Sequence, residues 1–147
     1  MSELRDRLAQ QAIEWVGVPY LHRGTTRRGC DCTGLLIGVL GELHPTLNYP
    51  LRKYPKDWNL HAMAGDYIRE ELSKVAEPLV RKAEPGDLLL FYFGRCVAHC
   101  AIVTGPLFVH AHVSAGKVEY GSLRTKKWAR RLADRWRIVP EKLERYL

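Results

Sequence analysis

The chain has 147 residues, 46% of them hydrophobic and 27% charged, and its formal net charge is +7. This length and composition predict one folded domain over residues 1–147 and exclude a disordered chain. The charged start lacks the apolar run of a secretory signal, and no stretch is long enough to span a bilayer, so we expect a protein made in the cytoplasm without membrane insertion.

The N-terminal segment is predicted to be an amphipathic helix. Its apolar residues recur at helical spacing: Leu4, Leu8, Ala12, Trp15 and Val16. Ser2 is the expected N-cap, and Gly17 and Pro19 end the helix. An extended segment over residues 18–21 and a basic loop over residues 24–29 are expected to follow.

A second helix is predicted from near Cys32 to about Leu43, where apolar residues cover most of the circumference and indicate burial. Its three glycines lower helix propensity but allow close packing: Gly34, Gly38 and Gly41. Residues 44–59 contain three prolines and are predicted to be a loop, which at this length often serves as a lid or groove wall. Residues 62–75 return to helical spacing.

The second half of the chain has short apolar runs separated by turns, which predict strands. These runs are Leu79–Val80, Leu88–Phe93, His99–Thr104, Phe108–Val113, Val118–Tyr120 and a closing Arg135–Val139. Turns are expected at residues 84–87 and at Gly116–Lys117. Helices followed by antiparallel strands predict an α+β fold.

Cys32 lies where the turn-forming segment 29–34 opens into the second helix. A thiol there faces unpaired backbone N–H groups and the positive end of the helix dipole, and both favour the nucleophilic thiolate. His99, on a predicted strand, can serve as its base. His110 can orient His99 if their strands are neighbours. A buried inert cysteine and a core histidine remain the alternative interpretations.

The four cysteines also allow a zinc site. Its candidate ligands are Cys30, Cys32, Cys96 and Cys100 with His99, His110 and His112. Their spacings match structural zinc motifs poorly, so we expect no metal and no other cofactor. A protein made in the cytoplasm is not expected to carry a disulfide framework either, which leaves Cys96 and Cys100 as packing residues.

Basic residues gather near the C-terminus. They are Arg124, Lys126, Lys127, Arg130, Arg131, Arg135 and Arg137, with Asp134 as the main offset. The segment is either a solvated face or a surface that attracts an anionic partner, such as cell-wall polymer, nucleic acid or a protein. Trp128 and Trp136 could stack on bases, but packing is their expected role, and no nucleic acid is required.

Five blocks occur in the order typical of the NlpC-type cell-wall cysteine peptidases, and they cover nearly the whole chain. They are Gly17–Tyr20, Gly29–Leu35, Pro85–Phe91, His99–Val103 and Phe108–Ala111. The resemblance implies a papain-like fold in which N-terminal helices pack on a C-terminal antiparallel sheet. It also implies hydrolysis of peptidoglycan stem peptides, typically at the D-γ-glutamyl-diamino-acid bond.

By motif position, the resemblance implies that Cys32 is the nucleophile, His99 the base and His110 the group that orients it. Tyr20 would lie near the thiol and help with the oxyanion or the substrate. Asp31 would shape the turn or the site for the substrate's amine. The chain departs from the family pattern at positions that carry no catalytic group: His22–Arg23, Cys30, Thr33 and Cys100.

The chain looks most like the phage and gene-transfer-agent subgroup of these peptidases. The similarity rests on the Cys-Asp-Cys sequence at residues 30–32, on Tyr54–Trp58, on the basic segment around Trp128 and on the closing Trp136–Val139. It implies a place in the tail or baseplate of a phage-like particle, with tail or baseplate proteins as partners and export by packaging or lysis. A structural tail component with little or no peptidase activity is the alternative.

Overall fold

The computed structural model describes residues 2–49 and 67–147. Three helices come first: α1 (Ser2–Ile13), α2 (Cys32–Leu43) and α3 (Tyr67–Leu72). A small hairpin of β1 (Thr25–Thr26) and β2 (Gly29–Cys30) leads into α2, where the sequence predicted only a basic loop. Among the described residues, no helix has the length and apolar character of a membrane span.

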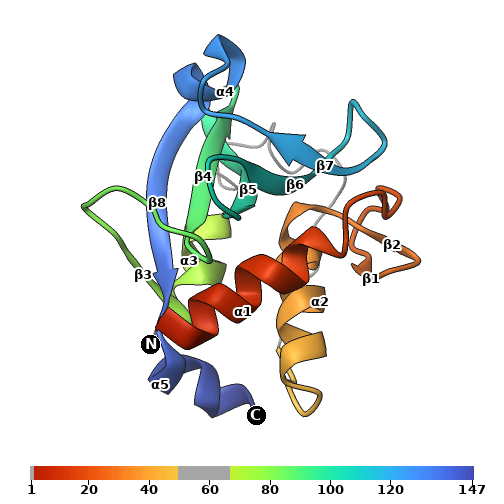
Figure 1. Cartoon of the computed structure of the whole chain (residues 1–147), viewed down its shortest axis with the longest axis vertical. Coiled ribbons are helices and arrows are strands. Elements are labelled where there is room, and N and C mark those ends of the chain that lie inside the picture. The colour runs from red at the N-terminus through yellow and green to blue at the C-terminus, as the bar shows by residue number, and fades with distance from the viewer. Residues whose placement is uncertain (1, 50–66) are drawn as a thin grey trace.

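The later part of the chain forms a six-stranded sheet, in which every neighbouring pair is antiparallel (Figure 1). In chain order the elements are β3 (Ala76–Pro78), β4 (Leu88–Phe93), β5 (Cys96–Val103), β6 (Phe108–His112), β7 (Lys117–Gly121), α4 (Lys126–Arg131), β8 (Leu132–Ile138), α5 (Pro140–Leu143) and a 3-10 turn (Glu144–Tyr146). Their order across the sheet is β3-β8-β4-β5-β6-β7. Helices followed by an antiparallel sheet confirm the predicted α+β fold.

Both faces of the sheet are covered, which explains why its central strands are apolar at consecutive positions. On one face, Leu90 and Ile102 belong to the large core that also contains Leu8, Leu35 and Ile68 from the three N-terminal helices. On the other face, a smaller cluster lies under α4. It comprises Leu89, Phe91, Ala101, Val103, Phe108 and Trp128.

The Pro85-Gly86-Asp87 block joins α1 to the sheet. Gly86 has φ +88°, and an added Cβ would collide with the backbone of Arg5, so only glycine suits this position. Asp87 is fully buried and accepts hydrogen bonds from Nε and Nη2 of Arg137 at 2.7 and 2.8 Å. The block therefore holds α1, the start of β4 and β8 together, although these elements lie far apart in sequence.

The first helix is shorter than predicted. It includes Ser2, which was expected to cap it, and ends at Ile13. Trp15 and Val16 follow in a turn of hydrogen bonds between residues three apart. Trp15 is buried as expected, but the assignment of Val16 to the apolar face was wrong, because the chain has left the helix and Val16 is 40% exposed.

The strand predicted at Leu79–Val80 was also wrong. The strand is Ala76–Pro78, because pairing with β8 places the buried Ala76 opposite Ile138, whereas Val80 is 99% exposed. Other strand ends differ by a few residues: β5 and β8 each begin three residues earlier than expected, and Lys117 belongs to β7. The short helices α4 and α5 were not predicted, since so few residues carry little periodicity.

The predicted loop and third helix are described only in part. Residues 44–49 contain neither helix nor strand, as expected, and the remainder of the loop lies outside the described residues. The helix predicted over residues 62–75 corresponds to α3, Tyr67–Leu72, and its first part lies outside the described residues as well.

Candidate active site

Cys32 is the first residue of α2, and Asp31 holds the turn that precedes it. Oδ1 of Asp31 accepts a hydrogen bond from the backbone N–H of Gly34, and Oδ2 accepts one from the N–H of Arg23, both at 2.8 Å. A Cβ on Gly34 would collide with the carbonyl oxygen of Gly24. The start of the helix is therefore pinned by a buried carboxylate that caps it. These bonds support the turn-shaping role of Asp31, while its contact with substrate stays a prediction.

Strand β5 docks on the first turn of α2 at two points. Sγ of Cys32 lies 3.9 Å from the carbonyl oxygen of Ala98. The thiol of Cys100 donates to the carbonyl oxygen of Cys32 at 3.3 Å. Ala98 and Cys100 are the two neighbours of His99, so these contacts bring the backbone of β5 at His99 to the start of α2.

His99 is hydrogen bonded to His110. Strands β5 and β6 are neighbours, with Ile102 opposite Val109. Nε2 of His99 lies 2.7 Å from Nδ1 of His110, and both imidazoles are buried. The expected contact between the two rings is therefore present. This bond occupies Nε2 of His99, so Nδ1 is the nitrogen that remains for a reaction with a thiol.

Aromatic rings enclose the two histidines. Trp128 of α4 stacks on His99 with ring centroids 5.5 Å apart, and Phe93 meets the same imidazole edge-on at 5.4 Å. Burial is the main cause that lowers the pKa of His99 well below its ordinary value, and the charges of His110, His112 and Lys127 add to it. Burial therefore keeps the imidazole neutral, which is the form that accepts a proton, and at the same time lowers its proton affinity.

Trp128 was expected to pack rather than to stack on bases, and it is indeed buried. Its place against the histidines was not foreseen, because α4 itself was not predicted. The available signal was an aromatic residue at the centre of a basic segment.

Tyr20 lies beside the start of α2, where it forms a β-bridge with Cys30. Burial is the main cause that raises the pKa of the Tyr20 hydroxyl far above its ordinary value, and electrostatic interactions with Cys32 and Asp31 add to the rise. The phenol therefore keeps its proton and remains a hydrogen-bond donor. This is the property that the predicted oxyanion role requires.

The model of the family described as "NlpC/P60 family" matches residues 17–137, which is most of the chain. The chain belongs to the NlpC/P60 family. Over 139 residues it is 27% identical to the murein DD-endopeptidase MepS/murein LD-carboxypeptidase of Escherichia coli (strain K12). The match covers 93% of this chain but only 64% of that relative's length.

Two solved structures illustrate the fold. An NLP/P60-family protein of Staphylococcus aureus superposes with a TM-score of 0.64 at 23% identity, covering 95% of this chain and 42% of that one. RipD of Mycobacterium tuberculosis is described as a non-catalytic NlpC/p60 domain protein adapted to peptidoglycan binding. It superposes with a TM-score of 0.57 at 15% identity, and the match covers 90% of this chain and 95% of RipD. These matches confirm the predicted papain-like architecture.

The cysteines of this NlpC/P60 domain are all buried, and none of them forms a disulfide. Cys30 is fully buried, and burial is the main cause that raises the pKa of its thiol to about 12. The zinc site that the sequence allowed is not assembled from cysteines. Within residues 2–49 and 67–147, the side chains grouped closely enough to hold a metal ion are His110, His112 and Glu119.

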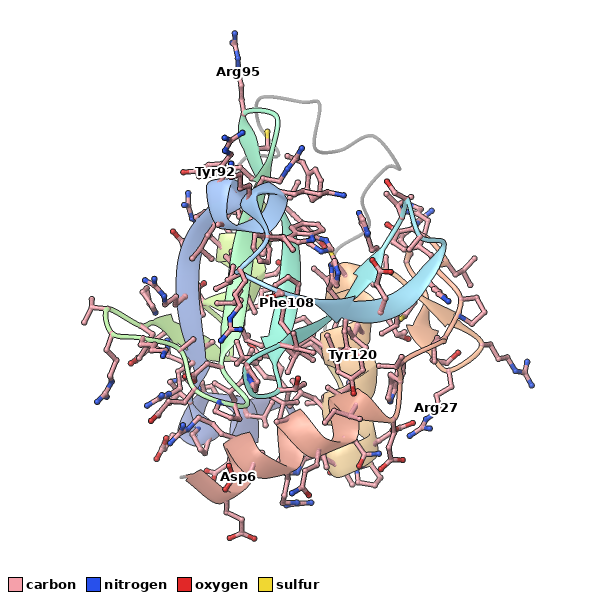
Figure 2. The ribbon with its side chains drawn as sticks, turned by 45° about the horizontal axis from the view of Figure 1, so that its top comes forward. Asp6, Arg27, Tyr92, Arg95, Phe108 and Tyr120 are labelled. Carbon is pink, nitrogen blue, oxygen red and sulfur yellow. The ribbon has the colours of Figure 1, made fainter. Side chains whose placement is uncertain are left out.

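The basic segment divides into two parts. Arg137 pairs with Asp87 and Glu84, while Asp134 pairs with Arg69 from α3. Arg135 also lies in β8, and the other basic side chains lie on or near α4: Arg124, Lys126, Lys127, Arg130 and Arg131. Figure 2 shows Tyr92 beside α4, and Arg95 projecting beyond it from the β4–β5 turn. Lys127 lies over the ring of Trp128 and Arg131 over that of Phe93, the two rings that contact His99, so Lys127 and Arg131 form a cationic rim beside the histidines.

Proposed function

We propose that this NlpC/P60 domain is a cysteine peptidase that hydrolyses peptidoglycan stem peptides. The observation that carries the proposal is the docking of β5 on the start of α2, which brings Cys32 to the backbone of His99 while His99 is bonded to His110. A thiol at a helix N-terminus, a neutral imidazole and a third group that orients it are the parts of a thiol peptidase.

The first half of the reaction is acyl transfer to sulfur. Nδ1 of His99 takes the thiol proton, and Sγ of Cys32 forms a bond to the carbonyl carbon of the scissile amide. The carbonyl oxygen becomes an oxyanion, which backbone N–H groups at the start of α2 and the hydroxyl of Tyr20 stabilise. The C–N bond then breaks, and the imidazolium of His99 gives its proton to the leaving amine.

The second half releases the product. A water molecule attacks the thioester carbon while His99 takes one of its protons. The C–S bond breaks, and the proton returns from His99 to the thiolate of Cys32. Throughout both halves, His110 accepts a hydrogen bond from Nε2 of His99 and keeps Nδ1 directed at the reacting atoms.

The cationic rim of α4 supports an anionic substrate. Stem peptides carry carboxylates, and Lys127 lies close enough to the histidines to lower the pKa of both. We propose the D-γ-glutamyl-diamino-acid bond as the one cut, in keeping with the motif resemblance of the chain.

We also propose that the domain works within the tail or baseplate of a phage-like particle, with tail or baseplate proteins as partners. The support is the resemblance carried by residues 30–32 and by the closing segment 136–139, where Trp136 and Ile138 are buried in β8. Co-purification with assembled particles would test this context, and a protein absent from such particles would contradict it.

The test of the activity compares the natural chain with Cys32→Ala on purified stem peptides and on whole peptidoglycan, with products identified by mass spectrometry. We expect cleavage by the natural chain and no cleavage by Cys32→Ala. The matched control Cys96→Ala, which removes another buried thiol, should still cleave. A cut that survives Cys32→Ala would overturn the assignment.

The alternative is a structural tail component with little or no activity. The non-catalytic description of RipD demonstrates that a similar fold can serve binding alone. Alkylation of the folded chain at neutral pH separates the two functions. An enzyme predicts selective modification of Cys32, which at 8% exposure is the most accessible of the four cysteines, whereas an inert thiol reacts slowly.

A further inference from the structure

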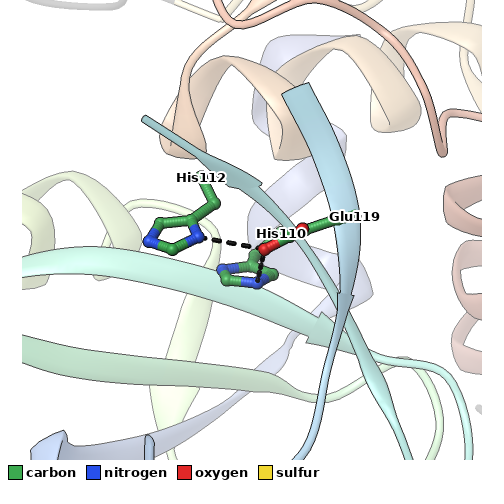
Figure 3. A group of neighbouring side chains, drawn as sticks. All are labelled: His110, His112 and Glu119. Atoms are coloured by element: carbon green, nitrogen blue, oxygen red, sulfur yellow. Dashed lines mark hydrogen bonds and ion pairs between the residues drawn. The ribbon is translucent and has the colours of Figure 1, made fainter. Parts of the chain in front are cut away.

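Three ligand-type side chains, those of His110, His112 and Glu119, lie close together (Figure 3). His110 and His112 point to the same face of β6, as alternate residues of a strand do, and their rings stack with centroids 5.1 Å apart. Glu119 comes from the neighbouring strand β7, where it stands opposite His110. Nδ1 of His112 and Nε2 of His110 lie 3.0 and 3.8 Å from the same oxygen, Oε2 of Glu119.

The Nε2 atom of His110 is unpartnered although it is fully buried. Its distance of 3.8 Å from Glu119 is too long for a hydrogen bond. Buried polar atoms without partners are rare, because their desolvation is not compensated. A ligand bound between this nitrogen and Oε2 of Glu119, 3.8 Å away, would supply the missing partner.

We propose that His110, His112 and Glu119 form a binding site for a divalent transition-metal ion of the Zn²⁺ type. Two imidazoles and a carboxylate are a ligand set that Zn²⁺ accepts, with water at the open position. The three ligand atoms lie within 4.8 Å of one another, so a shift of the half-exposed Glu119 side chain would bring them to the spacing around one ion. The cationic Lys127, which acts on His110, opposes binding and favours a reversible site.

A metal ion in this site would prevent His99 from acting as a base, without contacting Cys32. In the active arrangement, His99 carries its proton on Nε2, His110 carries its own on Nε2, and Nδ1 of His99 is free to take the thiol proton. A metal on Nε2 of His110 moves that proton to Nδ1, which then donates to His99. His99 must now carry its proton on Nδ1. The number of protons is unchanged, but the base is blocked.

The binding test uses the Cys32→Ala chain, which has lost the catalytic thiol as a ligand and needs no peptidase activity. Titration calorimetry with ZnCl₂ should give one site per chain. His112→Ala and the isosteric Glu119→Gln, each in this background, should weaken the affinity roughly tenfold or more, whereas His22→Ala should leave it unchanged. No binding to Cys32→Ala, or binding indifferent to both cluster variants, would overturn the site.

The switch is tested separately. The ¹⁵N shifts of the His99 imidazole in Cys32→Ala report its tautomer, and Zn²⁺ should move the proton from Nε2 to Nδ1; an unchanged tautomer in the zinc-bound chain contradicts the switch.

The inhibitory consequence rests on the proposed peptidase activity. In the active chain, zinc-buffered inhibition should weaken in Glu119→Gln. If Zn²⁺ binds Cys32→Ala but the natural chain cleaves nothing, the proposed function fails and the metal site stands.

Discussion

His110 is the residue on which the proposed chemistry and the proposed metal site meet. Its Nδ1 lies 2.7 Å from Nε2 of His99. In the proposed reaction it accepts a hydrogen bond there and touches neither the substrate nor the thiol. It is therefore a positioning residue, whose removal should change the rate of the chemical steps more than the binding of substrate.

We expect His110→Ala to lower kcat about 100-fold with little change in KM, because His99 loses the acceptor that orients it. His110→Asn should recover part of this loss, since its amide oxygen can accept the same bond. Steady-state kinetics on a stem peptide with chelator present would measure both variants. Equal losses in Ala and Asn with a lowered melting temperature would mean that His110 is structural.

Among the residues of the candidate site, the sequence predicted those whose position follows from their own helix or strand. Cys32 stands at a helix start, and alternation along one strand places His110 with His112. Trp128 and Glu119 were not assigned to the site, because each reaches it from another element. Their positions depend on how α4 and β7 fold onto the sheet, which no short-range pattern determines.

Among the elements, α2 carries the strongest sequence constraints. Gly38 faces the ring of Trp15 and the carbonyl oxygen of Thr25, which an added Cβ would overlap. Gly41 lies on the same helix with nothing within 4 Å of an added Cβ. The sequence predicted that the glycines of α2 allow close packing, and this is correct for Gly34 and Gly38 but not for Gly41.

The two positions should therefore respond in opposite ways to the same change. Gly41→Ala should raise the free energy of unfolding by about 0.5–1 kcal/mol, because alanine favours the helix and meets no obstacle. Gly38→Ala should lower it by about 1–3 kcal/mol through overpacking. Urea unfolding of both variants provides the comparison, and a stabilised Gly38→Ala would show that Trp15 moves aside at little cost.

The cap of α2 permits a second experiment on the same element. Asp31→Ala should destabilise the chain by about 1–2 kcal/mol, since the backbone N–H groups of Gly34 and Arg23 lose their acceptor. Asp31→Asn retains an acceptor oxygen and should cost less. Chemical denaturation measures the difference, and identical losses in the two variants would argue against capping as the role of Asp31.

Sequence patterns located some strands of the sheet and missed others. The central strands β4 and β5 were located because long apolar runs bury both faces of a strand. β3 was missed because Ala76–Pro78 becomes a strand only through its pairing with β8. Leu79–Val80 has the stronger apolar signal, yet in the described sheet only the N–H of Leu79 still bonds to β8, at the carbonyl oxygen of Arg135, and Val80 is exposed.

Across the whole molecule, Glu42 links three segments that the fold brings together. Its carboxylate accepts hydrogen bonds from Gln11 at 2.8 Å, from the indole of Trp15 at 2.9 Å and from Nε of Arg27 at 2.7 Å. The bond from Arg27 is the main cause that lowers the pKa of Glu42 to about 2. An unfolded glutamate has a pKa of about 4.3.

The difference between the pKa of Glu42 in the folded and unfolded chain determines how its contribution to the free energy of unfolding changes with pH. Between these two pKa values the unfolded chain binds more protons, so the contribution of Glu42 is complete above about pH 4.3 and is lost as the pH falls towards 2. Glu42→Gln should therefore lower the free energy of unfolding by about 1–2 kcal/mol at pH 7 and by much less near pH 3. Urea titrations at both pH values test this, with the exposed Glu77→Gln as control; an equal loss at both would contradict the linkage.

The docking of β5 on α2 also has a consequence for the order of synthesis. The thiol belongs to a helix in the first third of the chain, and the histidines belong to strands made much later. When Cys32 leaves the ribosome, no base yet exists to activate it, and none is in place until the sheet has closed against the helices. The growing chain would therefore carry an unactivated thiol, and the proposed hydrolysis would begin only with the completed fold.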